Sequence, residues 1–262
     1  MAAAVDLVKQ AVDYAASSGL TMFKKGEDGT ISGIQHCPMT LAPFALPRAA
    51  FEQVLEYALP FNRMVDRISR DTAFMYEALE GVVGSDAFTA NLLRISKAVN
   101  FHETGLRQKI ALGFHRSDYM LNEADGNMLQ VELNTISSSF GVLSDRIASM
   151  HRFLQQRFGQ TPDFELPANN VTQTLAHSIA EAHRLYELNH SLRGGGPGAG
   201  TVVVFVVQHN ETNIADQRPV EYALFEKHGV PVIRLTLADV YARTVRLVQV
   251  CAVALCVCCV SV

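Results

Sequence analysis

Apolar side chains recur at intervals of three and four residues through most of the first 190 positions, a spacing typical of amphipathic helices. At the N-terminus this pattern runs through MAAAVDLVKQAVDYAASSGL and ends near Gly19, so a first helix is expected there. Five further helices are predicted over residues 49–69, 71–83, 86–103, 145–158 and 171–190. This part of the chain should therefore be mainly helical, with one interruption.

The interruption is a pair of extended segments. Residues 109–121 and 127–137 flank an Asp125-Gly126 pair, which is a strong signal for a β-hairpin. In an extended strand, residues two apart point to the same side, so Glu132 and Asn134 share one face. An ordinary half-buried strand whose polar face meets water gives the same alternation, and that alternative stays open.

The pattern after residue 200 is that of a parallel sheet. Residues 201–208, TVVVFVVQ, form a continuous apolar run typical of a strand that is covered on both faces. Pro219 is expected in the first turn of a helix that ends at Gly229, and residues 230–237 predict a second buried strand. A strand–helix–strand unit of this kind should be parallel and right-handed. The fold class is therefore α/β, with α+β character in the helix-rich first part.

Two segments carry little chemistry. Residues 193–200, RGGGPGAG, lack the Gly-Lys-Ser/Thr of a phosphate-binding loop and precede a strand, so they are interpreted as a linker. Residues 247–262 contain no charge, but these sixteen positions fall short of the roughly 20 that a membrane helix needs. No membrane association is expected. A tail with this composition is typical of translation out of frame or through an intron.

Charge and targeting signals narrow the function classes. The 262 residues carry a formal net charge of −4, and the absence of a Lys/Arg run argues against nucleic acid as a partner. Asp6, Lys9 and Asp13 interrupt any apolar core of a signal peptide. We therefore expect a cytosolic protein.

The cysteines are distributed unevenly. Cys37 is the single cysteine of the first 250 residues, and four more crowd the last twelve. A disulfide framework would spread cysteines through the fold, so none is expected. The CVCC run at residues 256–259 has no His or acid after it to complete a zinc site.

The hairpin offers candidate chemistry. Glu132 and Asn134 provide a carboxylate and an amide oxygen on one face, which is the ligand type that Mg²⁺ prefers. Arg116, on the first extended segment, is a candidate clamp for carboxylate or phosphate. The hydroxyls of Ser137 and Ser139, with the backbone N–H groups of their turn, are candidates to hold a substrate carboxylate.

A second polar stretch follows the first buried strand, where ligands of open parallel sheets bind. Glu211 is suited to receive an ammonium group, and Asn213 and Gln217 are suited to donate to and accept from an amide. An irregular solvent-exposed loop is the alternative. No Ser/His/Asp grouping or activated cysteine stands out as a nucleophile, so the residues favour substrate positioning and electrostatic stabilisation.

Three motifs make the chain resemble the eukaryotic glutathione synthetase family, which belongs to the ATP-grasp superfamily. They are LGFHRSDYML (112–121), QVELNTISSSFG (130–141) and NETNIADQR (210–218), with FNRMVDRIS (61–69) and VPVIR (230–234) in support. The resemblance covers roughly residues 5–242. It implies a homodimeric cytosolic enzyme that joins γ-glutamylcysteine to glycine. The reaction would split ATP to ADP and phosphate through an acyl phosphate, with Mg²⁺.

The resemblance also implies roles for individual residues. Arg116 matches an arginine that binds substrate, Glu132 a glutamate that reaches both Mg²⁺ and ATP, and Asn134 a second metal ligand. The positions that match the γ-glutamylcysteine site are Ile136, Ser137, Ser138, Ser139, Glu211, Thr212, Asn213 and Gln217.

The same comparison implies a domain plan and a departure from it. Residues 1–193 match part of the ATP-binding region, 194–200 the linker and 201–244 the start of a substrate-binding domain; 245–262 form the divergent tail. The family's ATP-clamping half, with its phosphate-binding lysines and glycine-rich lid, would follow residue 242. We therefore expect this chain to be inactive alone and poorly folded, with its parallel sheet cut after two strands. Two alternatives are a non-catalytic product that dimerises with the full-length enzyme and an unrelated Mg²⁺-binding domain.

Overall fold

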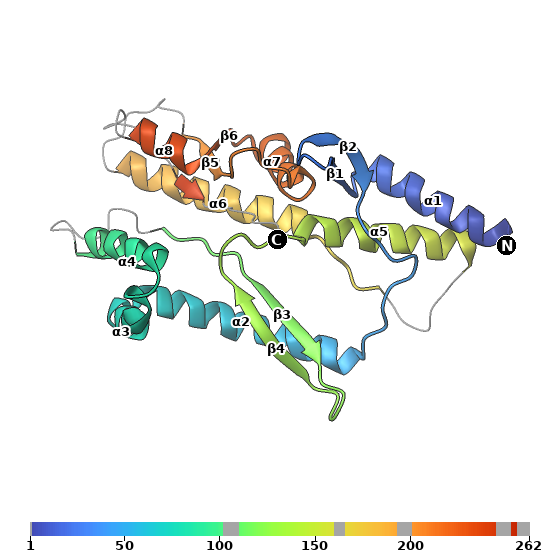
Figure 1. Ribbon diagram of the computed structural model, residues 1–262, viewed down its shortest axis with the longest axis horizontal. Helices are drawn as coiled ribbons and strands as arrows, with labels where there is room; N and C mark the ends of the chain where they lie inside the picture. Colours follow the sequence, from blue (N-terminus) through green and yellow to red (C-terminus); the bar gives the residue numbers. More distant parts are fainter. Residues whose placement is uncertain (1, 102–109, 160–165, 193–200, 245–252, 256–262) are drawn as a thin grey trace. The chain divides into compact units, whose positions relative to one another are not determined.

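Helices dominate the part of the chain that the computed structural model describes, which is residues 2–101, 110–159, 166–192, 201–244 and 253–255 (Figure 1). The eight helices of these residues are α1 (Ala2–Ser18), α2 (Arg48–Arg70), α3 (Thr72–Val83), α4 (Ala87–Asn100), α5 (Gly141–Phe158), α6 (Val171–Leu192), α7 (Ile214–His228) and α8 (Leu237–Thr244). The six helices predicted from the first 190 residues are confirmed. None of the described helices has the combined length and apolar character needed to cross a membrane.

The chain divides into two compact units. Unit 1 comprises residues 1–46 and 136–262, and unit 2 comprises residues 47–135. Residues 201–244 thus share a unit with the N-terminal helix and α5. The expected boundaries at 193 and 200 fall in residues outside the described part, and the family-based domain plan stays a prediction.

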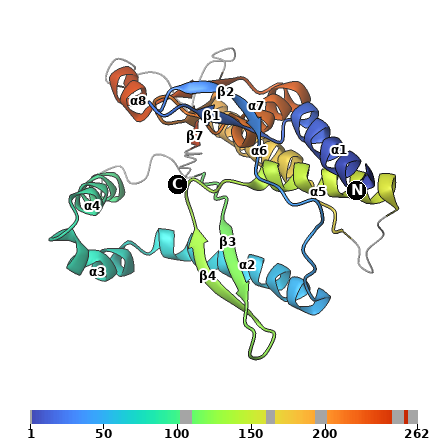
Figure 2. The same ribbon diagram turned by 45° about the vertical axis from the view of Figure 1, so that its right-hand side comes forward.

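Unit 1 holds its first core where α1 and α5 lie side by side (Figure 2). Ala11 and Ala15 of α1 are fully buried against Met150 and Leu154 of α5. The small alanine side chains allow the two helices to approach closely, and Cys37 completes this buried cluster from the segment after the first hairpin. That hairpin, β1 (Thr21–Lys25) and β2 (Ile31–His36), is antiparallel and was not predicted.

The parallel sheet of unit 1 has the strand order β6-β5-β7. Strand β5 (Val203–Val206) is buried at every position and pairs in parallel with β6 (Val232–Leu235), as the sequence predicted. A third strand, β7 (Val253–Leu255), pairs with the other edge of β5. The expectation of a two-stranded sheet is therefore wrong, because residues of the apolar tail continue it.

The start of α7 also differs from the prediction. The helix begins at Ile214, so Pro219 lies inside it and not in its first turn. Proline has no N–H, and the carbonyl of Ala215 consequently loses its normal helical donor. The Arg146 guanidinium of α5 lies 3.5 Å from this carbonyl oxygen and donates to it.

Unit 2 contains α2, α3, α4 and an antiparallel hairpin, β3 (Arg116–Leu121) and β4 (Met128–Asn134). One face of the hairpin packs on α2: the ring centroids of Tyr57 and Tyr119 are 6.4 Å apart, and the Met128 N–H donates to the Gln53 side chain. The hairpin turn contains Gly126 at φ +71°, as the Asp-Gly signal predicted.

Short polar caps separate the helices of unit 2. Asp71 ends α2 and begins α3, where its carboxylate accepts from the Phe74 N–H. Asp86 begins α4 and accepts from the N–H groups of Phe88 and Thr89. These carboxylates satisfy N–H groups that the first turn of a helix leaves without partners.

Candidate functional site

The β3–β4 hairpin of unit 2 gathers four polar side chains on one face. Its register places Arg116 opposite Asn134 and Asp118 opposite Glu132. The pairing shifts by one residue after Asp118, so Val131 is the extra residue of a bulge. Because the bulge follows these two pairs, the four polar side chains keep a common face, as strand alternation requires.

The four side chains interact directly. Arg116 donates to both carboxylate oxygens of Asp118, from Nε at 2.8 Å and from Nη2 at 2.9 Å. The Asn134 amide nitrogen lies 2.9 Å from a Glu132 carboxylate oxygen and 3.4 Å from one of Asp118. Arg116 Nη2 lies 3.7 Å from Glu132 Oε1. The prediction that Glu132 and Asn134 lie side by side near Arg116 is confirmed, whereas their functional roles stay predictions.

Asp118 is the member of this cluster that the sequence analysis did not select. Hydrogen bonds from the Arg116 guanidinium lower the pKa of its carboxyl below the ordinary value near 3.8, and the charge of Arg116 adds to this. A usable signal was present: Asp118 is two residues from Arg116 in an extended segment, so the two side chains share one face. The bidentate contact holds the guanidinium in one orientation.

The lowered pKa of Asp118 predicts a pH-dependent contribution to stability. A carboxyl whose pKa is lower in the folded state stabilises that state above the unfolded pKa, near 3.8, and loses this effect as pH falls through the folded value. We expect Asp118→Asn to reduce the free energy of unfolding by at most about 1 kcal/mol between pH 5 and 8, because the side chain is partly exposed and screened. Urea titrations should show this difference shrinking below about pH 4. Glu123→Gln, in the exposed hairpin turn, is the control, and a difference that grows in acid would contradict the assignment.

The oxygen atoms on this face of the hairpin are of the kind that binds a hard divalent cation. Two carboxylates and one guanidinium leave this face with a local charge of −1, and the Asn134 carboxamide adds a neutral oxygen once its amide is turned. Mg²⁺ is commonly held by one or two carboxylates, with waters and substrate phosphates as its other ligands. No group of three His, Cys, Asp or Glu side chains suited to a metal occurs among the described residues. The candidates in unit 2 are the smaller set of Glu132 and Asn134, with Asp118 beside them, and waters and substrate oxygens would have to complete the coordination.

In unit 1, the residues from Ile136 to Phe140 form a turn that leads into α5. Ser137 and Phe140 adopt left-handed backbone conformations, with φ of 58° and 70°. Ser139 is buried, whereas the Ile136 side chain is exposed. The turn therefore places its serines at the N-terminus of a helix, and Ser139 is the buried one.

The backbone N–H groups at this N-terminus already have a protein partner. The Asp216 carboxylate accepts from the N–H groups of Phe140, Val142 and Leu143. The N–H of Phe140, directly after the serines, is therefore not available to a substrate carboxylate, and the expected role of the N–H groups of the serines stays a prediction. Asp216 was not selected from the sequence, because no local pattern relates a residue of α7 to a helix that begins 75 positions earlier.

Two buried polar atoms without partners among the described residues lie near the start of α7, one on Glu211 before the helix and one on Gln217 within it. One carboxylate oxygen of Glu211 accepts from the Asn213 N–H at 2.8 Å, and the other, Oε2, is buried without a hydrogen-bond partner among the described residues. Gln217 is only 2% exposed. Its Oε1 accepts from Arg234 Nη2 at 2.6 Å, while its Nε2 is buried and also has no partner in the described part of the chain. An acceptor of negative charge and a neutral donor thus remain unsatisfied.

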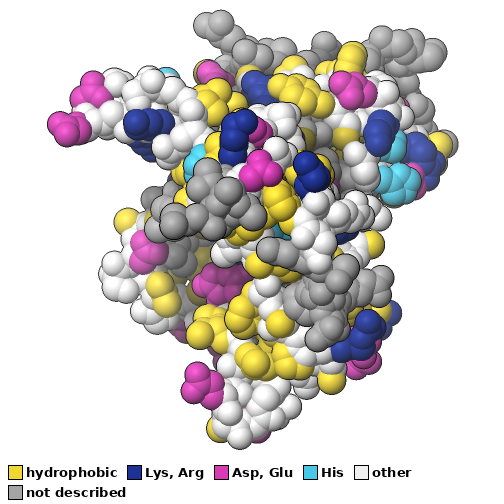
Figure 3. Space-filling view, turned by 90° about the vertical axis from the view of Figure 1, so that its right-hand side faces the viewer, with side chains coloured by type: hydrophobic (Ala, Val, Ile, Leu, Met, Phe, Trp, Pro, Cys, Tyr) yellow, Lys and Arg dark blue, Asp and Glu magenta, His cyan; other side chains and the backbone are white. Residues whose placement is uncertain are grey.

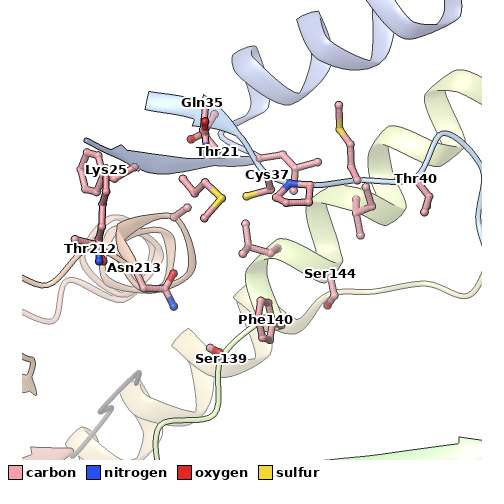
Figure 4. A pocket seen from close by; sticks show the side chains of 18 residues that line it. Thr21, Lys25, Gln35, Cys37, Thr40, Ser139, Phe140, Ser144, Thr212 and Asn213 are labelled. Carbon is pink, nitrogen blue, oxygen red and sulfur yellow. The ribbon is translucent and has the colours of Figure 1, made fainter. Parts of the chain in front are cut away.

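A cavity of about 1190 Å³ in unit 1 joins the two predicted stretches (Figure 4). Ser139 reaches it from the serine turn, and Thr212 and Asn213 reach it from the residues before α7. Figure 4 shows Cys37 and Thr40 on another wall, which the segment after β2 provides. The remaining lining residues are Leu20, Thr21, Met22, Phe23, Lys25, Gln35, Pro38, Met39, Phe140, Leu143, Ser144, Ile147 and Ala215.

The Cys37 wall was missed because the β1–β2 hairpin was missed. Burial raises the pKa of the Cys37 thiol above its ordinary value, and this effect outweighs the opposing influence of the nearby Arg146 guanidinium. A raised pKa keeps the thiol protonated at neutral pH, so Cys37 is a packing and lining residue and not an activated nucleophile. Of the predicted residues of unit 1, the structure brings Ser139, Thr212 and Asn213 to this cavity; Ile136, Ser137, Ser138, Glu211 and Gln217 lie outside its lining.

On the face drawn in Figure 3, the Lys and Arg side chains of the described residues are dispersed among acidic and apolar side chains. Such a mixture differs from the basic stripe that binds nucleic acid.

Comparison with known proteins places these features in a family context. The model of the eukaryotic glutathione synthase ATP-binding domain matches residues 2–249, seven residues beyond the expected end at 242. The chain is 40% identical over 220 residues to the chloroplastic glutathione synthetase of Solanum lycopersicum, covering 82% of this chain and 38% of that protein. It is 36% identical over 239 residues to the glutathione synthetase of Homo sapiens, covering 90% of this chain and 48% of that protein.

A solved structure shows the same fold. It is a glutathione synthetase-like effector from Globodera pallida in its apo form, with a TM-score of 0.70 and 21% sequence identity. The match covers 90% of this chain and 50% of that one. The chain thus spans half or less of the length of each of these relatives.

Proposed function

The chain belongs to the eukaryotic glutathione synthase family, and on that premise we propose that it supplies peptide- and metal-binding residues for ATP-dependent synthesis of glutathione. The reaction proposed is the ligation of γ-glutamylcysteine to glycine, with ATP split to ADP and phosphate through an acyl phosphate. Unit 1 supplies the residues for the peptide, and the hairpin of unit 2 supplies those for Mg²⁺. A cytosolic homodimer is part of the same proposal and rests on the family resemblance.

The observation that carries the peptide part is the pair of unsatisfied buried atoms, Oε2 of Glu211 and Nε2 of Gln217. A buried polar atom without a partner costs about 1–3 kcal/mol, so such atoms persist where a ligand completes them. The γ-glutamyl end of the peptide carries an α-ammonium and an α-carboxylate. The ammonium suits the Glu211 oxygen, and the carboxylate suits the Gln217 amide N–H. Glu211 and Gln217 do not line the cavity, but Thr212 and Asn213, which follow Glu211 in the chain, line it together with Ser139. The rest of the peptide would extend from the two buried groups toward this cavity.

The metal part rests on the hairpin. Glu132 and Asn134 would hold Mg²⁺, which supplies electrostatic stabilisation of the transferring phosphoryl group when bound. Asp118 fixes the orientation of Arg116 through its two hydrogen bonds. A guanidinium held in this way is suited to bind a carboxylate or phosphate of the substrate. The chain's own residues thus orient charged groups and form no covalent bond to substrate.

Mn²⁺ provides a paramagnetic probe of the metal assignment. We expect substoichiometric Mn²⁺ to broaden the amide resonances of residues 116–118 and 132–134 selectively in a ¹H–¹⁵N spectrum. Glu132→Gln should abolish this selectivity because it removes a carboxylate ligand, whereas Glu123→Gln in the turn of the same hairpin should leave it intact. Equal broadening in the wild type and Glu132→Gln would place the ion elsewhere.

Calorimetric titration tests the peptide assignment. We expect saturable binding of γ-glutamylcysteine to the purified chain and none of glycylcysteine, which has a cysteine but no γ-glutamyl group. Equal heats for both peptides would refute the assignment.

The family resemblance places the ATP-clamping residues beyond residue 242, so a polypeptide of only these 262 residues should show no ATP- and glycine-dependent phosphate release above background. Turnover above background would contradict this.

A further inference from the structure

Helix α5 begins without a cap from its own neighbourhood. Its N-cap residue is Phe140, whose side chain has no hydrogen-bonding group, and Phe140 makes no side-chain cap. The first turn of a helix has N–H groups without helical partners, and Ser, Thr, Asp or Asn at the N-cap usually satisfies them. Here the required acceptor comes from a distant part of the sequence.

That acceptor is the carboxylate of Asp216, which is 7% exposed and lies in the first turn of α7. It accepts from the N–H of Phe140, from Val142 N–H at 2.9 Å and from Leu143 N–H at 3.2 Å. Three donors on one carboxylate, together with the positive end of the helix dipole, fix where the helix begins. Ser139 immediately precedes these donors and is equally buried, so its position depends on the same contact.

A reciprocal contact ties the two helices together. Arg146 of α5 donates to the carbonyl of Ala215, the one that Pro219 leaves without a helical N–H. The same guanidinium donates to the carbonyl of Gly19, just after α1. Helix α7 thus supplies an acceptor to α5, and α5 supplies a donor to α7, at adjacent residues of α7.

We infer that Asp216 is a positioning residue for the peptide site: its carboxylate locks the serine turn bearing Ser139 onto the helix bearing Gln217. The inference rests on the proposed function for the identity of the ligand. Gln217 is the next residue of α7, so one short segment holds both the cap and a side chain with an unsatisfied buried amide. The peptide would meet Ser139 and Gln217 in a fixed relation only while the cap is intact.

Binding of γ-glutamylcysteine to variants of the full chain tests this inference. Asp216→Ala should raise the Kd by about tenfold or more, because a small misplacement of binding groups has large effects. Asp216→Asn retains one acceptor oxygen but places an NH2 donor where the second oxygen accepts, so it should recover only part of the affinity. Leu154→Ala is the matched control for stability: it removes a buried side chain of α5 and should lower Tm while leaving Kd unchanged at temperatures where the chain is folded. An unchanged Kd in Asp216→Ala, or an equal rise in Leu154→Ala, would overturn the inference.

Amide hydrogen exchange provides a second readout that needs no ligand. In Asp216→Ala, we expect faster exchange at Phe140, Val142 and Leu143, with Met150 of the same helix unaffected. Unchanged exchange at the three donors would refute the positioning role. If the wild type itself does not bind the peptide, the proposed function fails, and the exchange data decide on the role of Asp216 independently.

Discussion

Glu211→Gln is expected to weaken γ-glutamylcysteine binding by about 10- to 150-fold, which corresponds to the loss of a charge-assisted hydrogen bond of about 1.5–3 kcal/mol. The substitution retains an oxygen that can accept from the Asn213 N–H, so the local turn keeps its hydrogen bond. It removes the negative charge from the buried Oε2 position, where we place the ammonium of the ligand. Calorimetric titration of the purified variants measures the effect.

A ligand without the ammonium makes this prediction specific. Glutarylcysteine, which lacks the α-amino group of γ-glutamylcysteine, should bind the wild type as weakly as γ-glutamylcysteine binds Glu211→Gln. The variant itself should hardly distinguish the two ligands, because the interacting pair is already broken. Glu226→Gln, an exposed position of α7, is the control and should bind like the wild type. If removing the ammonium weakened binding to Glu211→Gln by the same factor as binding to the wild type, Glu211 would not be its partner.

Arg234→Met is expected to reduce the free energy of unfolding by about 3 kcal/mol. Arg234 and Arg218 both donate to the carboxylate of Glu221, which is 5% exposed on α7. Removal of the more buried arginine leaves this carboxylate only partly compensated, and a buried charge that loses a partner is strongly destabilising. Arg234 also donates to Gln217, so the variant should lose part of its peptide affinity.

Urea-induced unfolding of a matched pair of variants checks this expectation. Arg184→Met breaks a hydrogen-bonded ion pair with Glu181 on the exposed face of α6 and should change the free energy of unfolding far less, because solvent screens that pair. The difference between the variants isolates the effect of burial, since both replace arginine with methionine. Equal costs would show that the Arg234–Glu221 pair contributes no more than a surface ion pair.

Sequence periodicity sufficed for the helices, whose apolar residues recur at three- and four-residue spacing, and the β3–β4 hairpin was predicted from its alternating residues and its Asp-Gly turn. Periodicity failed for β1 and β2, whose residues are mostly exposed and so leave no strong alternation. A local signal did exist there: Asp28-Gly29 is the same type of pair as Asp125-Gly126, and Gly29 has φ +77°. Turn chemistry would have found this hairpin where hydrophobicity did not.

In the candidate site, too, local patterns were predictable from the sequence and contacts between distant residues were not. Glu132 and Asn134 were placed together because strand alternation acts over two residues, and Arg116 was placed near them because it lies on the neighbouring predicted strand. Asp216 and Cys37 reach their positions through tertiary packing, which periodicity does not encode. Pro219 was misplaced for a related reason: its missing N–H is compensated by Arg146 from another helix, so α7 tolerates it internally.

The most direct test of the peptide assignment is a ¹H–¹⁵N titration of the assigned chain with γ-glutamylcysteine. We predict saturating shifts concentrated at residues 137–140 and 211–217, with the side-chain amide of Gln217 among the largest. Resonances of strands β5 and β6, which lie outside these two segments of the sequence, should move little. Shifts that avoid both segments, or that grow without saturation, would contradict the account.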